Sequence, residues 1–233
     1  MSPADVNPAV LVMAKAPVAG RVKTRLGVVV GDAAAADLAA ACVLDTIDVC
    51  EAVFTGRERL HVALDGDLDR TVRHREIAER LGGWTVHPQR GDSFSSRLAN
   101  AHLDVGRATG GPVVQIGMDT PHLAAAALRE VAERVGGDND AVLGPAEDGG
   151  WWVLAVSRPE LARCLGGVRM STSRTCADTI AALEAHGARV RLTLYRIHLY
   201  LLMLAEGPSR GIPVGSERHE RLTTLIREEL SRL

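Results

Sequence analysis

Residues 9–26 read AVLVMAKAPVAGRVKTRL, and this stretch decides the fold. Its first five residues are apolar and predict a buried β-strand. The strand leads into a loop with a proline, a glycine and four cations within eleven residues: Lys15, Arg21, Lys23 and Arg25. Backbone N–H groups and cationic side chains in such a loop can hold an anion such as a polyphosphate. The alternative interpretation is a solvated basic loop.

The composition limits the class of protein. The chain has 233 residues, of which 46% are hydrophobic and 24% charged, as is usual for a globular protein with one sizeable α/β domain or two small ones. Its net charge of -2 provides no overall basic field that would recruit nucleic acid or an anionic membrane. Phosphate binding therefore has to come from a local cluster of cations.

The cysteines and the termini predict a cytoplasmic protein. None of the four cysteines forms a CxxC pair, so no structural zinc site is expected. Cys42 and Cys50 are separated by roughly 12 Å of helical rise, too far for a disulfide, and free thiols fit a reducing cytoplasm. The first residues do not resemble a signal peptide, and no apolar stretch reaches the roughly 18 residues of a membrane span.

The rest of the chain alternates between strand-like and helix-like segments. This order predicts an α/β fold, a three-layer αβα sandwich with a mostly parallel sheet. One domain over residues 1–233, with an atypical tail from about residue 196, is the simplest organisation. The expected strands are 60–64, 84–87, 112–116, 141–143, 151–156 and 190–194, and the expected helices are 31–54, 68–81, 93–105 (with a serine cap at Ser93), 123–135, 173–186 and 216–233.

Polar motifs follow three of the predicted strands. In a parallel α/β sheet, ligands bind beyond the carboxyl ends of the strands. The cationic loop follows the first strand, Gly117-Met118-Asp119-Thr120-Pro121 follows the strand at 112–116, and Gly144 to Gly150 (GPAEDGG) precedes two tryptophans. Carboxylates that face a cationic loop suit a site in which Mg²⁺ or Mn²⁺ bridges protein and phosphate oxygens.

Each motif also has a structural interpretation. Asp119-Thr120-Pro121 could cap the helix expected from Leu123. Residues 147–150 could form a plain turn, and residues 89–92 (QRGD) a surface loop. The histidines show no metal-binding spacing, so we treat four of them as structural or surface residues: His61, His87, His102 and His122.

The motifs taken together resemble a bacterial family of GT-A-like transferases described as glycosyltransferase-like or arsenosugar-associated. The molybdenum-cofactor and 2-phospholactate guanylyltransferases are more distant relatives. The family pattern runs MAKxPxxGxVKTRL, QxGxxxxRLxxA, GxDxPxL, LGPAxDGGYYLLG and then ST. Here these motifs correspond, in order, to residues 13–26; Gln89, Gly91 and Arg97-Leu98; Gly117, Asp119, Pro121 and Leu123; residues 143–154, with Trp151-Trp152 for the tyrosines; and Ser171-Thr172.

The resemblance implies a nucleotide-diphospho-sugar transferase (GT-A, Rossmann-like) fold and assigns a role to each motif. Asp119 would hold Mg²⁺ or Mn²⁺, and Lys23 and Asp148 are the candidate catalytic residues. The nucleotide would be bound by Ala14, Lys15, Gly20, Arg21, Lys23, Thr24, Arg25, Gln89, Gly91 and Gly117. The acceptor side would comprise Glu147, Asp148, Gly149, Gly150, Trp151, Ser171 and Thr172.

The tail departs from the family pattern. Relatives end the last core strand with an acidic DVDTxxDL or DIDTPEDL stretch, whereas this chain has an apolar segment at 195–204. Three interpretations remain open. The tail packs on the core or forms a dimer surface; the metal site is incomplete or is completed by Asp148; or the source sequence has an altered reading frame.

The motifs favour a metal-dependent transferase that uses an activated nucleotide. The first hypothesis is transfer of a sugar from a nucleotide sugar to a small acceptor, because the loop and the metal would stabilise the departing diphosphate. The second is nucleotidyl transfer (of a guanylyl or cytidylyl group) to a phosphorylated small molecule. The third is a non-catalytic nucleotide-binding protein. None of these hypotheses involves a nucleic acid or a membrane.

Overall fold

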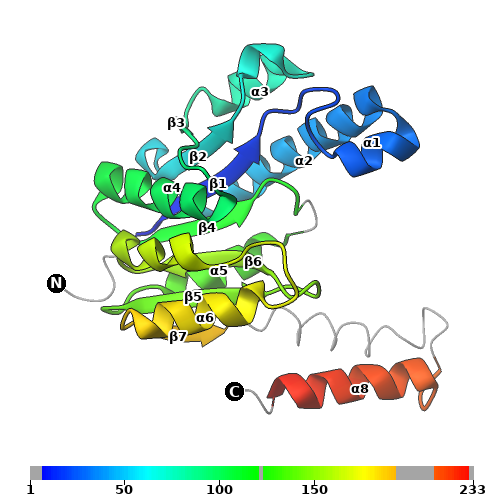
Figure 1. The fold of residues 1–233 in the computed structure, drawn as a ribbon, viewed down its shortest axis with the longest axis vertical. Helices are drawn as coiled ribbons and strands as arrows, with labels where there is room; N and C mark the ends of the chain where they lie inside the picture. The colour runs from blue at the N-terminus through cyan, green and yellow to red at the C-terminus, as the bar shows by residue number, and fades with distance from the viewer. Residues whose placement is uncertain (1–6, 121–122, 193–212, 231–233) are drawn as a thin grey trace. The chain divides into compact units, whose positions relative to one another are not determined.

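The predicted alternation of strands and helices forms one seven-stranded sheet (Figure 1). The computed structural model describes residues 7–120, 123–192 and 213–230. The strand order is β3-β2-β1-β4-β6-β5-β7. The strands are β1 Ala9–Lys15, β2 Leu60–Asp65, β3 Thr85–Pro88, β4 Val113–Gly117, β5 Asp140–Pro145, β6 Trp151–Val156 and β7 Arg189–Leu192.

The opening strand lies at the centre of the sheet because it is apolar on both faces. The first six residues of β1 are buried, and β1 pairs in parallel with β2 and β4, with Lys15 opposite Asp65 and Met13 opposite Gly117. β6 runs antiparallel to both β4 and β5. The α/β fold class with a mostly parallel sheet is thus confirmed, with β6 reversed.

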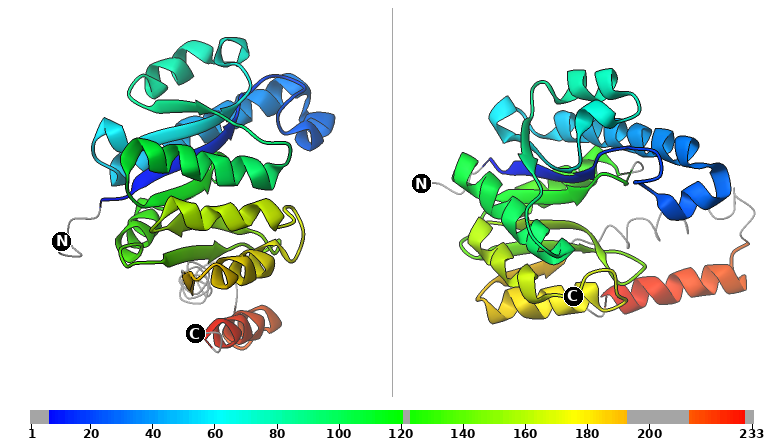
Figure 2. Two further views of the ribbon diagram at one scale, coloured as in Figure 1. Left: turned by 60° about the vertical axis from the view of Figure 1, so that its left-hand side comes forward. Right: turned by 45° about the horizontal axis from the view of Figure 1, so that its top comes forward.

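Helices cover both faces of the sheet (Figures 1 and 2). On one face the sheet residues Val10, Val12 and Ile116 form a core with α2 Asp32–Val53, α3 His74–Leu81 and α5 Ala125–Arg134. On the other face lie α4 Phe94–Thr109, the 3₁₀ segment η4 Pro159–Gly167 and α6 Thr175–Ala185. The expected three-layer arrangement is therefore present.

Several local predictions need correction. The cationic loop ends in a short helix, α1 Thr24–Val30, that the sequence did not predict. The helix expected over 68–81 is a 3₁₀ turn, η3 Leu68–Arg70, followed by α3. A further 3₁₀ turn, η2 Arg57–Arg59, precedes β2. The serine cap of α4 is confirmed, since Ser93 and Ser96 form a reciprocal capping box.

The chain divides into two compact units, residues 1–191 and 192–233. The described part of the second unit contains the helix α8 Glu217–Leu230. The apolar segment 195–204, Pro121 and His122 lie outside the described residues. Within the described part of the chain no helix is long and apolar enough to span a bilayer. The four cysteines are free thiols: Cys42, Cys50, Cys164 and Cys176.

Candidate nucleotide-binding site

A cleft of about 840 Å³ opens beyond the carboxyl ends of β1, β2 and β4. Lys15, Asp65 and Gly117 end these strands and line the cleft. Their carboxyl ends meet at one edge because the three strands are parallel neighbours. The cleft is thus where such a sheet is expected to bind its ligand.

A second cleft of about 610 Å³ adjoins the first along the cationic loop. Lys15 and Asp65 line both clefts. Of the residues predicted to bind nucleotide, Ala14, Arg25, Gln89 and Gly117 line the first cleft, and Gly20, Arg21 and Thr24 line the second. Lys23 and Gly91 line neither.

Lys23 joins the cationic loop to the GxDxP motif. Its Nζ lies 3.2 Å from Oδ2 of Asp119, and the two side chains are 28% and 57% exposed. Lys23 adopts a left-handed backbone conformation, with φ of 44°, at the start of α1. Such conformations are unfavourable for residues other than glycine and occur often at functional sites. The loop therefore places one cation against the predicted metal ligand.

Asp119 does not cap the following helix. α5 begins at Ala125, its N-cap residue is Ala124, and no side chain caps it. The capping interpretation of the Asp119 motif is therefore wrong, because the helix starts two residues later than the sequence predicted. The Asp119 carboxylate instead faces the first cleft.

The Asp148-Gly149-Gly150 turn forms part of the opposite wall. Oδ1 of Asp148 accepts a hydrogen bond from the Gly150 N–H at 2.9 Å, and Asp148 and Gly150 line the cleft. Gly149 has φ of +84°, and a Cβ added there would lie 2.1 Å from the Ser173 carbonyl oxygen. This position therefore requires glycine so that the turn can pack against the loop before α6.

The remaining acceptor-side residues lie mostly around the same wall. Trp151, Ser171 and Thr172 line the cleft, whereas Glu147 and Gly149 do not. The Trp151 indole N–H donates to Thr179 Oγ1 at 3.2 Å. The adjacent Trp152 also lines the cleft and packs against the core on the other face of the sheet. Ser171 shares with Lys23 a left-handed conformation, with φ of 60°.

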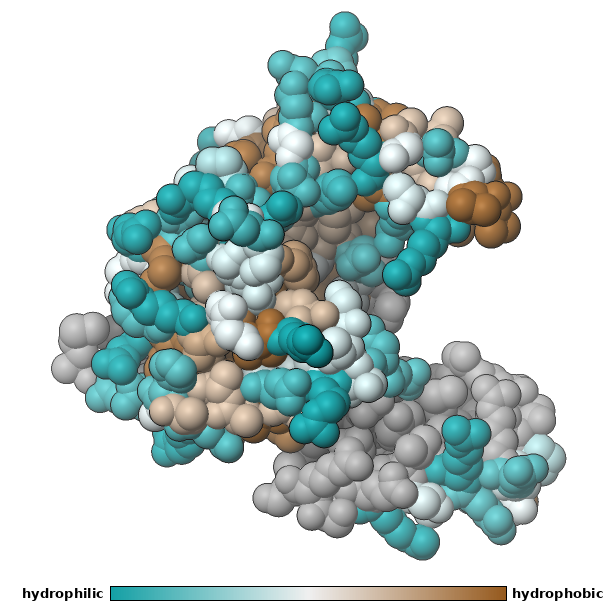
Figure 3. Space-filling model, in the orientation of Figure 1, coloured by the Kyte–Doolittle hydropathy of each residue, from teal (hydrophilic) through white to brown (hydrophobic). Residues whose placement is uncertain are grey.

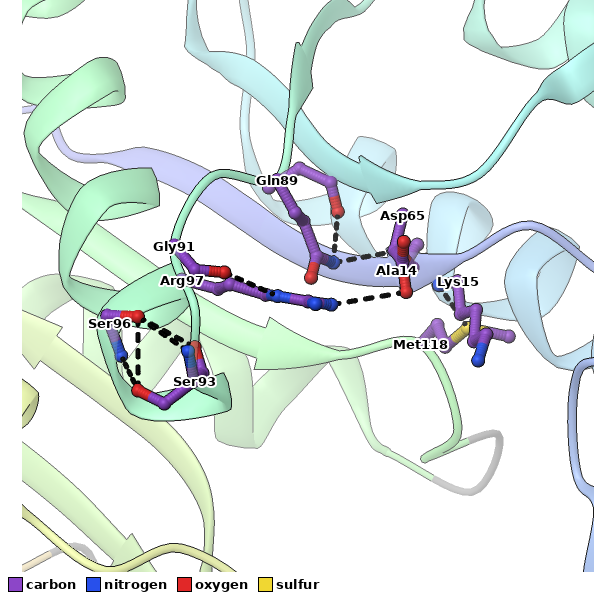
Figure 4. A network of polar contacts seen from close by, with 10 residues as sticks. Ala14, Lys15, Asp65, Gln89, Gly91, Ser93, Ser96, Arg97 and Met118 are labelled. Carbon is purple, nitrogen blue, oxygen red and sulfur yellow. Dashed lines mark hydrogen bonds and ion pairs between the residues drawn. The ribbon is translucent and has the colours of Figure 1, made fainter.

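The QxG…RL motif braces the cleft (Figure 4). The Gln89 side-chain amide donates to the carbonyl oxygens of Ala14 at 2.9 Å and Ala63 at 3.0 Å. Its amide nitrogen is thus already bonded to the main chain, which gives Gln89 a structural role beside its predicted contact with nucleotide. Arg97 donates to the Gly91 carbonyl at 3.2 Å and lies 3.3 Å from Oδ2 of Asp65.

Asp65 is a cleft residue that the sequence analysis missed. It ends β2 and is held by Arg97, so its carboxylate is fixed at the junction of the two clefts. The available signal was the Asp-Gly-Asp sequence that follows the strand expected at 60–64. Asp65, like Asp119, is an acidic residue at the end of a strand, where a parallel sheet binds its ligand.

The acidic residues do not form a preformed metal cage. Within the described parts of the chain, no group of three or more His, Cys, Asp or Glu side chains could hold a metal ion. Asp119 instead offers one exposed carboxylate at the cleft. Mg²⁺ commonly binds proteins through one or two carboxylates together with the phosphates of a substrate. The donor set therefore fits a metal that arrives with a nucleotide.

The fold is shared with several solved proteins. A protein from Desulfovibrio desulfuricans G20, provisionally described as a nucleotide-diphospho-sugar transferase, superposes with a TM-score of 0.69 at 22% identity, over 96% of this chain and 98% of that one. Rv0371c from Mycobacterium tuberculosis H37Rv superposes with a TM-score of 0.50 at 21% identity, over 80% of this chain and 87% of that one. A cytidylyltransferase from Leptospira borgpetersenii serovar Hardjo-bovis (strain JB197) superposes with a TM-score of 0.52 at 11% identity, over 81% of this chain and 76% of that one.

These likenesses define the class of fold, that of the nucleotide-diphospho-sugar transferases, as the sequence motifs implied. The family follows from the sequence. Residues 46–172 match the family described as "Uncharacterized protein conserved in bacteria (DUF2064)", and the chain belongs to it. A comparison with functionally curated proteins gives no match.

Proposed function

We propose that the protein is a metal-dependent transferase that uses an activated nucleotide and moves a sugar from a nucleotide sugar to a small acceptor. The observation that carries this proposal is the Lys23–Asp119 pair at the edge of the first cleft. A cationic loop and a carboxylate beyond the strand ends are what a metal–diphosphate complex needs. The solved relatives share the fold and so are consistent with a nucleotide-using transferase.

The two clefts suggest how the nucleotide would lie. The nucleoside would occupy the second cleft, and the diphosphate would lie at the junction of the clefts, beside Lys15 and Asp65. Arg21 in the second cleft and Arg25 in the first would neutralise the phosphate oxygens. Charge-assisted hydrogen bonds of this kind are roughly twice as strong as neutral ones.

Asp119 would hold the Mg²⁺ or Mn²⁺. When bound, the metal would polarise the phosphate oxygens and stabilise the charge that develops on the departing diphosphate. Lys23 would leave Asp119 and turn to the phosphates, where it would stabilise the same charge. The ion pair in the free protein holds Lys23 beside Asp119, at the edge of the first cleft, before the ligand arrives.

The acceptor would bind against the Asp148 wall. Oδ1 of Asp148 is engaged by the Gly150 N–H, which leaves Oδ2 to accept the proton of an acceptor hydroxyl. Trp151 would offer a flat apolar surface to a sugar ring. Ser171 and Thr172 complete this side of the cleft.

Calorimetric titration of nucleotides and nucleotide sugars, with and without Mn²⁺, followed by product analysis, tests the proposal. We expect metal-strengthened binding and release of a nucleoside diphosphate. Release of pyrophosphate from a nucleoside triphosphate would indicate nucleotidyl transfer instead. Binding without any product would indicate a nucleotide-binding protein, and the absence of binding would contradict the whole account.

A further inference from the structure

Gln115 is a polar residue in the middle of the sheet. It lies on β4, is 3% exposed, and is flanked in register by Leu11 of β1 and Leu154 of β6. Its Oε1 is buried and has no hydrogen-bond partner. Burying an unpaired amide costs free energy, so this residue calls for an explanation other than packing.

His102 on α4 is the polar neighbour of Gln115. It is fully buried, and burial lowers the pKa of its imidazole to about 4, against a smaller opposing effect of the nearby Gln115 amide. The ring is therefore neutral near pH 7. Both ring nitrogens of His102, like Oε1 of Gln115, are buried without a hydrogen-bond partner, and His102 lies close enough to the Gln115 amide for that amide to affect its pKa.

The amide nitrogen of Gln115 is the end of the side chain nearest the cleft. Gln115 lines the first cleft, so the small exposed part of its side chain opens there. Because Oε1 is buried, the amide nitrogen is the group left to meet a ligand. Gln115 lies two residues before Gly117 on the same face of β4, roughly 7 Å deeper along the strand. Its surroundings in the cleft include the apolar side chains of Met13 and Leu98.

We propose that Gln115 is the specificity-determining contact at the floor of the first cleft, where its amide donates a hydrogen bond to a hydroxyl or carbonyl oxygen of the non-nucleotide part of the ligand. His102 is a positioning residue behind it. This inference rests on the proposed function and specifies its substrate class. The group bound beside the phosphates is a small polar, hydroxylated compound, because an alkyl chain would leave the amide unpaired.

Nuclear magnetic resonance of protein labelled with ¹⁵N-glutamine tests the contact directly. The sequence has only two glutamines, Gln89 and Gln115. Gln89 is an internal control because its amide already donates to the Ala14 and Ala63 carbonyls. A Gln115→Leu variant assigns the two side-chain signals.

The probes are UDP and GDP, the nucleotide sugars UDP-glucose and GDP-mannose, and free D-glucose with and without UDP. We expect UDP and GDP to leave the Gln115 amide signal in place. A shift with a nucleotide sugar identifies the donor sugar as the contact, and a shift with D-glucose identifies the acceptor. If nucleotides bind but no sugar-bearing probe shifts the Gln115 signal more than that of Gln89, the inference is wrong.

The two proposals can fail separately. If UDP, GDP and their nucleotide sugars all fail to bind, the proposed function is wrong. D-glucose alone then still tests the role of Gln115. A shift of the Gln115 amide signal on addition of D-glucose supports the proposed contact, and no shift overturns it. For whichever probe shifts the signal, Gln115→Leu should weaken binding about tenfold, the effect of losing one hydrogen bond worth about 1.4 kcal/mol. The affinity for UDP or GDP should not change.

The melting temperature provides the matching control. Replacing a buried, poorly paired amide by an apolar side chain of similar size is nearly neutral or stabilising, so Gln115→Leu should not lower it. His102→Leu should weaken the binding of the same probe by a smaller factor. It should also shift the Gln115 amide signal of the protein without ligand. Equal loss of sugar and diphosphate affinity in Gln115→Leu would show that the residue only maintains the fold.

Discussion

Removing the Lys23 ammonium tests the role of the cationic loop. In the free protein Lys23 lies 3.2 Å from Asp119, and in the nucleotide complex it would contact phosphate. Lys23→Ala therefore removes one interaction from each state. The change in affinity is the difference between the two.

The structure sets the size of this difference. Because the Lys23 and Asp119 side chains are 28% and 57% exposed, their ion pair is worth about 0.2–1 kcal/mol. A charge-assisted hydrogen bond to phosphate contributes about 1.5–3 kcal/mol. The net loss is about 0.5–2.8 kcal/mol, with a midpoint of about 1.6 kcal/mol, so we expect nucleotide binding to weaken by about tenfold. We expect the same for Arg25→Ala.

Calorimetric titration measures this loss, and Lys23→Gly separates charge from backbone. Lys23 has φ of 44°, a conformation that glycine adopts without strain. Lys23→Gly should lose the same affinity as Lys23→Ala while melting at a higher temperature than that variant. Unchanged affinity in Lys23→Ala and Arg25→Ala would refute the reasoning and show that the loop is a solvated surface.

Three further predictions concern the wall, the turnover and the pH dependence. Gly149→Ala should lower the free energy of unfolding by about 2 kcal/mol or more, because its Cβ would lie 2.1 Å from the Ser173 carbonyl and φ is +84°; denaturant titration should show a smaller effect for Gly166→Ala, where nothing lies within 4 Å. Asp148→Asn should reduce turnover more than nucleotide affinity, and equal turnover would make the turn purely structural. His102 binds protons less readily in the folded state, where its pKa is about 4, than in the unfolded chain, where it is 6.5. The free energy of unfolding should therefore be highest above about pH 6.5 and should fall as the pH drops toward 4. Thermal melts should show a smaller fall in His102→Leu.

The sequence was sufficient to predict the sheet and the place of the site. The apolar run at 9–13 predicts a buried strand, which β1 confirms, and polar motifs that follow parallel strands meet at one edge of the sheet. The capping box at Ser93 was also visible, because it depends on residues close in sequence.

The reversed strand could have been predicted as well. Only residues 146–150 connect β5 and β6, and a parallel crossover needs a dozen or more residues. The short helix α1 was harder to foresee. Its sequence TRLGVVV contains a glycine and four β-branched residues, which are weak helix formers. The three valines of α1 are exposed, with Val28 88% exposed, and Figure 3 shows an apolar patch where Figure 1 places α1.

Long-range pairings could not be predicted from a single sequence. Lys23–Asp119 and Arg97–Asp65 join residues 96 and 32 positions apart. Their partners depend on which strands are neighbours and in what register. Asp119 could be recognised as a capping residue or as a ligand, and the start of α5 at Ala125 decided against capping.

The most direct test of metal-dependent nucleotide binding is the dissociation constant of a nucleotide, with and without Mn²⁺, in the natural protein and in Asp119→Asn. Asparagine keeps the size of the side chain and removes its charge, and no helix cap is lost because α5 begins at Ala125. We predict that Mn²⁺ strengthens binding to the natural protein and has little effect on the variant. Undiminished metal dependence in Asp119→Asn would contradict the assignment of Asp119 as the metal ligand and remove the main chemical support for the transferase.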